Sequence, residues 1–231
     1  GHLYGLAIDL GTTTVVISLV DLENGKSITT SAFENPQRFG GSDIMHRISY
    51  DGAHHGELRK AIINAINHEI LQMEERFGFV RQEIYEIVAV GNSTMRDILF
   101  KLDVQSIGQR PYKSTIEQAY LAGERSTTSL TEKTRRLGIR ANPKARVYGL
   151  PLIASHVGAD TAAALVAMDM AAQKETVMLI DVGTNTEVVI GHAGRMLAAS
   201  CPAGPAFEGG LIKYGMPGYD GAVESVRWVD G

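Results

Sequence analysis

Apolar and polar positions alternate with two different periods along the chain. In residues 55–76 the apolar side chains recur every three or four positions, at Leu58, Ile62, Ile66, Ile70 and Met73. This spacing predicts one long amphipathic helix that ends near Gly78. Residues 84–90 are apolar enough for a buried strand, and Asn92 then supplies the N-cap of a helix that reaches about residue 101.

One hydroxyl-rich segment occurs twice. Residues 8–17 (IDLGTTTVVI) align without gaps onto residues 180–189 (IDVGTNTEVV), with six of ten positions identical. Each copy contains an apolar strand, an Asp, a Gly, a polar turn and a second apolar strand, which predicts a β-hairpin. Two such copies in one chain favour a fold built from two similar halves.

The rest of the chain gives weaker signals. Residues 105–143 hold most of the irregular polar sequence and predict a loop-rich insertion, either a partner-docking surface or a solvated loop. Residues 146–150 are typical of a short strand, and residues 159–172 of a small-residue helix. A generic α/β order explains these elements equally well, so the duplicated hairpin is what favours a particular architecture.

Composition and charge exclude several classes of protein. The chain has 231 residues, is 44% hydrophobic and carries a net charge of −4, so it can bury a core but offers no basic surface for nucleic acid or an anionic membrane. No apolar run is long enough for a spanning helix or a signal peptide. A single cysteine, Cys201, excludes a disulfide framework and a cysteine-held cluster within these residues, which favours a reducing, cytoplasmic compartment. At the end of an apolar run, Cys201 is expected to be buried and to have no catalytic part.

The two turns have the chemistry of a phosphate site. A turn rich in Gly and Thr brings backbone N–H groups and hydroxyls toward one point, which suits phosphate oxygens. Asp9 and Asp181, one before each turn, add two carboxylates suited to a hydrated magnesium ion that bridges phosphates. The alternative for each Asp is a carboxylate that caps its own turn.

Three motifs resemble those of one ATPase superfamily. Residues 8–18 and 179–191 resemble the two phosphate motifs of the superfamily that includes actin, sugar kinases and heat-shock chaperones, and residues 160–165 (DTAAAL) are similar to its linking helix. The resemblance implies an α/β, ribonuclease-H-like actin-type ATPase fold with ATP and Mg²⁺ in a cleft between two halves. The expected division is a complete first half over 1–175, with the insertion at 105–143 and the linking helix at 159–172, and an incomplete second half over 176–231.

Further matches narrow the family. Residues 90–95 (VGNSTM), 156–160 (HVGAD) and 203–209 (AGPAFEG) resemble the ATPase domain of reductive activators of corrinoid-dependent methyltransferase systems. The resemblance implies that ATP drives electron transfer from an iron–sulfur cluster to a Co(II) corrinoid protein, restoring Co(I). The cluster of these activators lies in an N-terminal ferredoxin-like domain that this sequence lacks, so the chain is either a fragment, which its length favours, or a clusterless member. An unfinished second half predicts dimerisation.

The resemblance also implies residue roles. The expected phosphate contacts are Gly11, Thr12, Thr13 and Thr14 on one side and Gly183, Thr184, Asn185 and Thr186 on the other. Asp9 and Asp181 would hold a magnesium-bound water. Asp160 would orient the attacking water, although an acid favoured by the helix dipole is an equally simple explanation. Glu208 either faces the cleft or is an acid in the first turn of a helix.

Two other functions use the same scaffold. A small-molecule kinase would need an acceptor pocket and a base, for which Asp160 is the only candidate. An actin-like assembly module would use nucleotide as a switch and would polymerise with rising concentration. The matches at residues 91–95 and 203–209 favour the activator.

Overall fold

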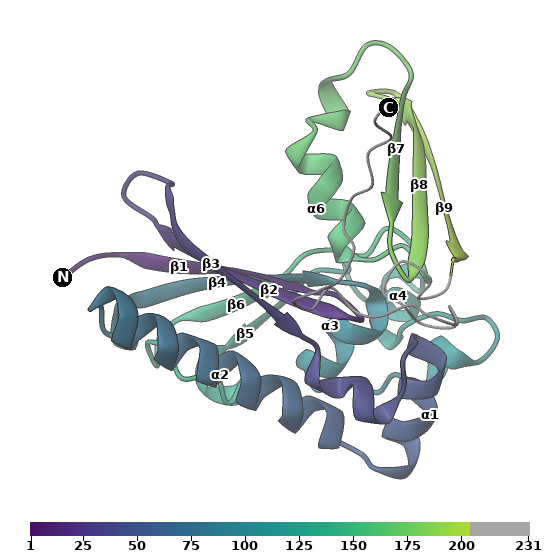
Figure 1. The fold of residues 1–231 in the computed structure, drawn as a ribbon. Coiled ribbons are helices and arrows are strands. Elements are labelled where there is room, and N and C mark those ends of the chain that lie inside the picture. Colours follow the sequence, from purple (N-terminus) through teal and green to yellow (C-terminus); the bar gives the residue numbers. More distant parts are fainter. Residues whose placement is uncertain (204–231) are drawn as a thin grey trace, which may run out of the picture.

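The computed structural model describes residues 1–203, which form two β-sheets and the helices beside them (Figure 1). The larger sheet has the strand order β3-β2-β1-β4-β6-β5, and the smaller has the order β7-β8-β9. The larger sheet contains β1 (Tyr4–Leu10), β2 (Thr14–Asp21), β3 (Ser27–Glu34), β4 (Ile84–Gly91), β5 (Leu130–Lys133) and β6 (Arg146–Gly149). Strands β1, β2 and β3 pair antiparallel in chain order, and β4 then pairs parallel with both β1 and β6.

One face of the larger sheet is covered by the long helix α2 (Glu57–Phe77), as Figure 1 shows. The alternation of β1 and β2 turns every second side chain toward the core, including Leu6, Ile8, Leu10, Val15, Ile17 and Leu19. The apolar positions of α2 are buried against the same core. Gly78 ends α2 in a left-handed conformation, with φ 70°. The predicted long helix is therefore confirmed, although it begins at Glu57 because Gly56 precedes it with φ 83°.

The remaining helices lie in the connections between the strands. They are η1 (Pro36–Gly40), α1 (Ile44–Ala53), η2 (Arg81–Glu83), α3 (Ser93–Leu99), η3 (Gln105–Gly108), α4 (Thr115–Leu121), α5 (Thr134–Leu137), α6 (Ala159–Ala167) and η4 (Met170–Ala172). Asn92 caps α3 as predicted, because its Oδ1 accepts a hydrogen bond from the Met95 N–H at 3.0 Å. Within the described residues, no helix is both long enough and apolar enough to cross a lipid bilayer.

The segment 105–143, predicted as a loop-rich insertion, also contains short helices and a strand. It contains the helices α4 and α5, and its strand β5 joins the larger sheet by pairing antiparallel with β6. The fully buried Arg96 on α3 donates to the carbonyls of Thr128 and Leu150 at 2.8 and 3.0 Å. Elements of four to seven residues are too short to show a period in the sequence, so the sequence did not indicate them.

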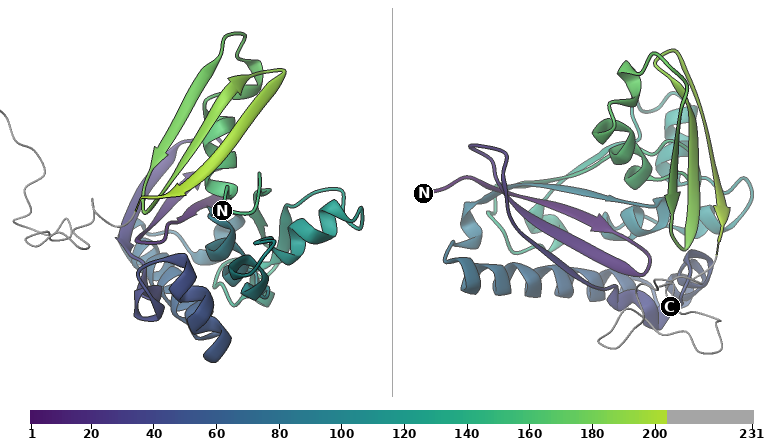
Figure 2. Two further views of the ribbon diagram at one scale, coloured as in Figure 1. Left: turned by 90° about the vertical axis from the view of Figure 1, so that its right-hand side faces the viewer. Right: turned by 45° about the horizontal axis from the view of Figure 1, so that its top comes forward.

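The smaller sheet stands beside α6, over one end of the larger sheet (Figure 2). It consists of β7 (Val177–Val182), β8 (Asn185–His192) and β9 (Arg195–Pro202). The helix expected over residues 159–172 ends at Ala167, and Asp169 with φ 47° separates it from η4. Large apolar side chains on this sheet remain more than half exposed, at Met178, Ile180, Val182 and Leu197. Cys201 is also exposed, so the expectation that it is buried was wrong, because no other described residue covers it.

Candidate functional site

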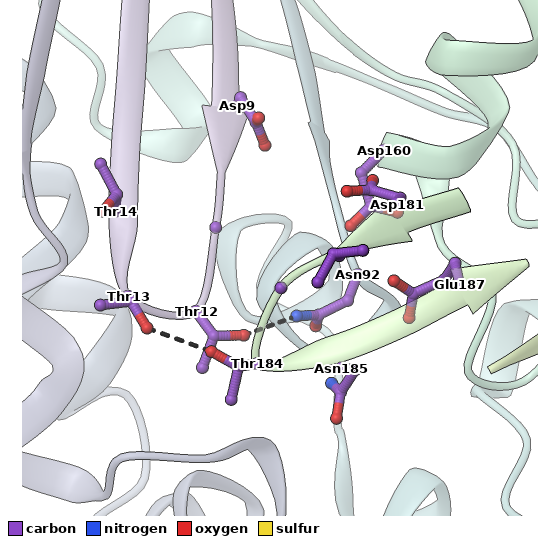
Figure 3. Close-up of a pocket in the computed structure, with 13 residues that line it drawn as sticks. Asp9, Thr12, Thr13, Thr14, Asn92, Asp160, Asp181, Thr184, Asn185 and Glu187 are labelled. Atoms are coloured by element: carbon purple, nitrogen blue, oxygen red, sulfur yellow. Dashed lines mark hydrogen bonds between the residues drawn. The ribbon is translucent and has the colours of Figure 1, made fainter. Parts of the chain in front are cut away.

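The two predicted hairpins face one cavity of about 340 Å³ between the sheets (Figure 3). Its lining comes from the β1–β2 hairpin, the residue after β4, the first turn of α6 and the β7–β8 hairpin. The lining residues are Asp9, Gly11, Thr12, Thr13, Thr14, Asn92, Asp160, Asp181, Val182, Gly183, Thr184, Asn185 and Glu187. The fold therefore brings together side chains that lie more than 170 residues apart in the sequence.

The tip of the first hairpin is built for a close backbone approach. A Cβ on Gly11 would lie 2.3 Å from the Thr14 carbonyl oxygen, so only glycine fits this turn without a shift of the backbone. Thr12 is buried, and its Oγ1 accepts a hydrogen bond from Asn92 Nδ2 at 3.0 Å. The hydroxyls of Thr13 and Thr184 share a hydrogen bond of 3.2 Å, which joins the two turns directly (Figure 3).

The second hairpin turns only some of its predicted residues into the cavity. The Gly183 N–H donates to the Asn185 carbonyl at 3.1 Å and closes the turn. Side chains alternate along β8, so Asn185 and Glu187 line the cavity and Thr186, between them, belongs to the opposite face. Thr186 is thus absent from the lining of the cavity among the described residues.

Four carboxylates line this one cavity. Figure 3 shows Asp9 on the side of β1 and Asp160, Asp181 and Glu187 on the side of the smaller sheet. Burial raises the pKa of Asp9 to about 6, and the charges of Asp160 and Asp181 add to this effect. Burial is also the main cause that raises the pKa of Glu187 to about 7, against a hydrogen bond from Ser200. Burial likewise raises the pKa of Asp160.

The donor set fits a hydrated magnesium ion better than a directly ligated metal. Within the described residues, no three His, Cys, Asp or Glu side chains form a group that could hold one metal ion. Magnesium keeps several of its waters and binds through one or two carboxylates together with phosphate oxygens. Asp9 and Asp181, one from each hairpin, offer such carboxylates, and their mutual repulsion makes a cation favourable between them.

Two polar residues of the cavity were not predicted from the sequence to belong to the site. Glu187 occupies the position that Val15 has in the first copy of the repeat. An acid in place of an apolar residue is the feature of the sequence that could have indicated a role in the site. Asn92 was predicted as a helix cap alone, and its second bond, to Thr12, depends on the pairing of β1 with β4. The candidate Glu208 lies outside the described residues, so its place is not assigned.

Two similar hairpins on separate sheets, facing each other across a polar cavity, define the actin-type ATPase fold. Residues 4–173 match the family model described as the RACo middle region. Residues 175–231 match the C-terminal domain of RACo, the ASKHA domain. The chain therefore belongs to the RACo family, as its motifs indicated.

Comparisons of the sequence and of the structure both find named relatives of this chain. The chain is 32% identical to the corrinoid activation enzyme RamQ of Eubacterium limosum and covers 37% of that protein with 99% of its own length. It is 26% identical to the [Co(II) methylated amine-specific corrinoid protein] reductase of Methanosarcina barkeri, with 97% of this chain and 41% of that protein covered. A solved reductive activator for corrinoid,iron-sulfur protein superposes with a TM-score of 0.82 at 37% identity, over 93% of this chain and 33% of that one. The chain thus spans between a third and about two fifths of the length of these relatives.

Proposed function

We propose that this chain forms the nucleotide-phosphate site of an ATP-dependent reductive activator of a corrinoid protein. The observation that carries the proposal is the cavity between two Asp–Gly–Thr hairpins that belong to different sheets. Relatives that match almost the whole chain are named as a corrinoid activation enzyme and as a corrinoid protein reductase, which supports the substrate class. The proposed division of the chain remains a first half over residues 1–175 and the start of a second half from residue 176.

The two hairpins divide the work of binding. Backbone N–H groups and hydroxyls of Gly11–Thr14 hold the phosphates from one side, and the turn at Gly183–Asn185 holds them from the other. Asp9 and Asp181 would hold a magnesium ion, which would supply positive charge against the phosphates. A phosphate bound here competes with the Thr13–Thr184 hydrogen bond, so binding changes the contact between the two sheets.

Hydrolysis needs a group that accepts a proton from the attacking water. Asp160 and Glu187 are the two acids of the cavity that do not belong to the predicted magnesium pair, and a pKa of about 7 leaves Glu187 poised for this step. The proton passes from the water to the carboxylate as the water oxygen attacks the terminal phosphorus. The bond from that phosphorus to the bridging oxygen breaks, and ADP and inorganic phosphate leave. We assign Glu187 as the base and Asp160 as the residue that orients the water.

Hydrolysis is coupled to reduction through motion of the two halves. An iron–sulfur cluster held outside residues 1–231 would supply the one electron that reduces Co(II) of the corrinoid protein to Co(I). The proposed partner is a corrinoid protein, and the proposed compartment is the cytoplasm. The exposed apolar face at Met178, Ile180 and Leu197 is the surface through which two copies would pair.

The test uses the full-length protein mixed under reducing conditions with a Co(II) corrinoid protein. Formation of Co(I) is followed by its absorbance with and without MgATP, in the unaltered protein and in Asp9→Ala and Asp181→Ala. We expect Co(I) only with MgATP and loss of the signal in both variants. If ATP is hydrolysed while cobalt stays oxidised, the phosphate site stands but the activator function does not.

A further inference from the structure

Three successive carbonyl groups of the first turn are held from behind by two buried residues. Asn35 Nδ2 donates to the Gly11 carbonyl at 2.8 Å, and Arg47 Nη2 donates to the Thr12 carbonyl at 2.6 Å. The backbone N–H of Asn35 donates to the Thr13 carbonyl at 2.7 Å. Asn35 precedes η1 and Arg47 lies on α1, so both approach the turn from the larger sheet's own half.

These bonds decide where the N–H groups of the turn point. In a planar trans peptide the C=O and the following N–H point in opposite directions. With the carbonyls of Gly11, Thr12 and Thr13 directed at Asn35 and Arg47, the N–H groups of the next residues are directed away from them. Among the described residues, neither the Thr12 nor the Thr13 N–H donates a hydrogen bond. Successive N–H groups turned to one side form a concave site for an anion.

Arg47 brings a positive charge to the back of this turn. The side chain is 1% exposed, and within the described part of the chain it forms no ion pair. Its other polar contacts are the Gly41 carbonyl at 3.0 Å and the Met95 sulfur at 3.2 Å. Burial lowers the pKa of Arg47 only to about 10, so the guanidinium remains charged at neutral pH. Asp43, at the start of α1, favours the charged form of Arg47 but does not form an ion pair with it, so burial still prevails and lowers the pKa. An anion on the far side of the turn would offset the remaining penalty of burying this charge.

We propose that Arg47 and Asn35 are positioning residues for phosphate: they fix the carbonyls of residues 11–13 away from the cavity, and Arg47 supplies the counter-charge. The inference rests on the proposed phosphate site and adds two residues that do not line the cavity. The ligand class is a polyphosphate chain, because it meets both the N–H groups and the buried charge. A neutral nucleoside meets neither of them.

The experiment measures binding of MgATP, inorganic tripolyphosphate and adenosine to the full-length protein by calorimetry. Arg47→Met removes the charge and the bond to Thr12 but keeps an apolar side chain of similar length. Arg59→Met is the matched control, because Arg59 also donates to two backbone carbonyls, of Leu99 and Leu137, away from the cavity. Asn35→Ser removes the bond to Gly11, while a serine can still cap η1.

We expect R47M to weaken tripolyphosphate and MgATP by about 10-fold or more, as befits the loss of a hydrogen bond from a charged donor. Adenosine binding should stay unchanged, R59M should stay within about twofold of the unaltered protein, and R47K, which keeps the charge, should recover part of the loss. If Arg47 had a purely structural role, R47M would weaken the binding of tripolyphosphate, MgATP and adenosine alike. Its effect would then resemble that of R59M.

The inference is overturned if R47M binds tripolyphosphate as the unaltered protein does, or if R47M and R59M weaken it equally. If R47M does not fold, N35S is the deciding variant. A loss of about threefold in its affinity for tripolyphosphate supports the inference, and an unchanged affinity overturns it. If the unaltered protein binds neither MgATP nor tripolyphosphate, the proposed phosphate site fails and this inference fails with it.

Discussion

Replacing Glu187 by glutamine should stabilise the chain in the absence of nucleotide, and only at high pH. Glu187 is 9% exposed, and its Oε1 accepts a hydrogen bond from Ser200 Oγ at 2.8 Å. Burial first, and then the charges of Asp160 and Asp181, raise its pKa from 4.5 to about 7. Glutamine has nearly the same shape and can keep the bond from Ser200, so the substitution removes mainly the charge.

The sign and size of this change in stability follow from the protonation of the Glu187 carboxyl group in the folded and the unfolded chain. Above pH 4.5 the unfolded chain releases this proton, whereas the folded chain holds it until about pH 7, so stability falls as the pH rises across that window. One pKa unit corresponds to about 1.4 kcal/mol, which sets an upper value of about 3 kcal/mol at pH 8. Water in the cavity screens the charge, so we expect a gain of about 2 kcal/mol from E187Q at pH 8.

The assay is urea unfolding at pH 5 and pH 8 without nucleotide and with a chelator present. E175Q serves as the control, because Glu175 is exposed and forms no hydrogen bond or ion pair with the described residues. E187Q should exceed the unaltered chain in unfolding free energy at pH 8, with a much smaller difference at pH 5, and E175Q should change neither value. An equal effect of E187Q at both pH values, or a loss of stability at pH 8, would refute the argument from charge burial.

Three further substitutions test the site and the exposed sheet. Asn92→Ala removes the cap of α3 and the bond to Thr12, so thermal unfolding should show a loss of about 1 kcal/mol and calorimetry weaker MgATP binding; unchanged affinity would contradict the role of this bond. Gly11→Ala forces a Cβ against the Thr14 carbonyl and should abolish MgATP binding, whereas Gly194→Ala, with only ordinary contacts, should bind normally; equal binding by both would exclude a tight first turn. Ile180→Asp places a charge on the exposed apolar face and should lower the apparent mass in light scattering if two copies pair there; a mass that matches the unaltered chain would remove this face from the interface.

Local patterns were sufficient for the long elements and for the two hairpins. The three- and four-residue spacing of α2 and its terminal Gly78 predict that helix, because period and capping are properties of consecutive residues. The repeat of Asp, Gly and Thr at residues 9–14 and 181–186 likewise indicates two polar turns of one kind. Both signals are short-range, so no tertiary contact is needed to read them.

Only the tertiary structure decided which side chains meet. Strand β5 forms because β6 supplies its hydrogen-bonding partner, and a strand of four residues is too short to be predicted from its periodicity. Pairing of β1 with β4 places Asn92 beside Thr12, and burial next to two other acids changes the pKa of Glu187. Arg47 is the sharpest case, since an arginine in a helix usually faces solvent and here its position behind the turn leaves it buried. Pairing partners, burial and electrostatic neighbours are set by residues distant in the chain, and for that reason the sequence alone identified the turns but not the side chains that hold them.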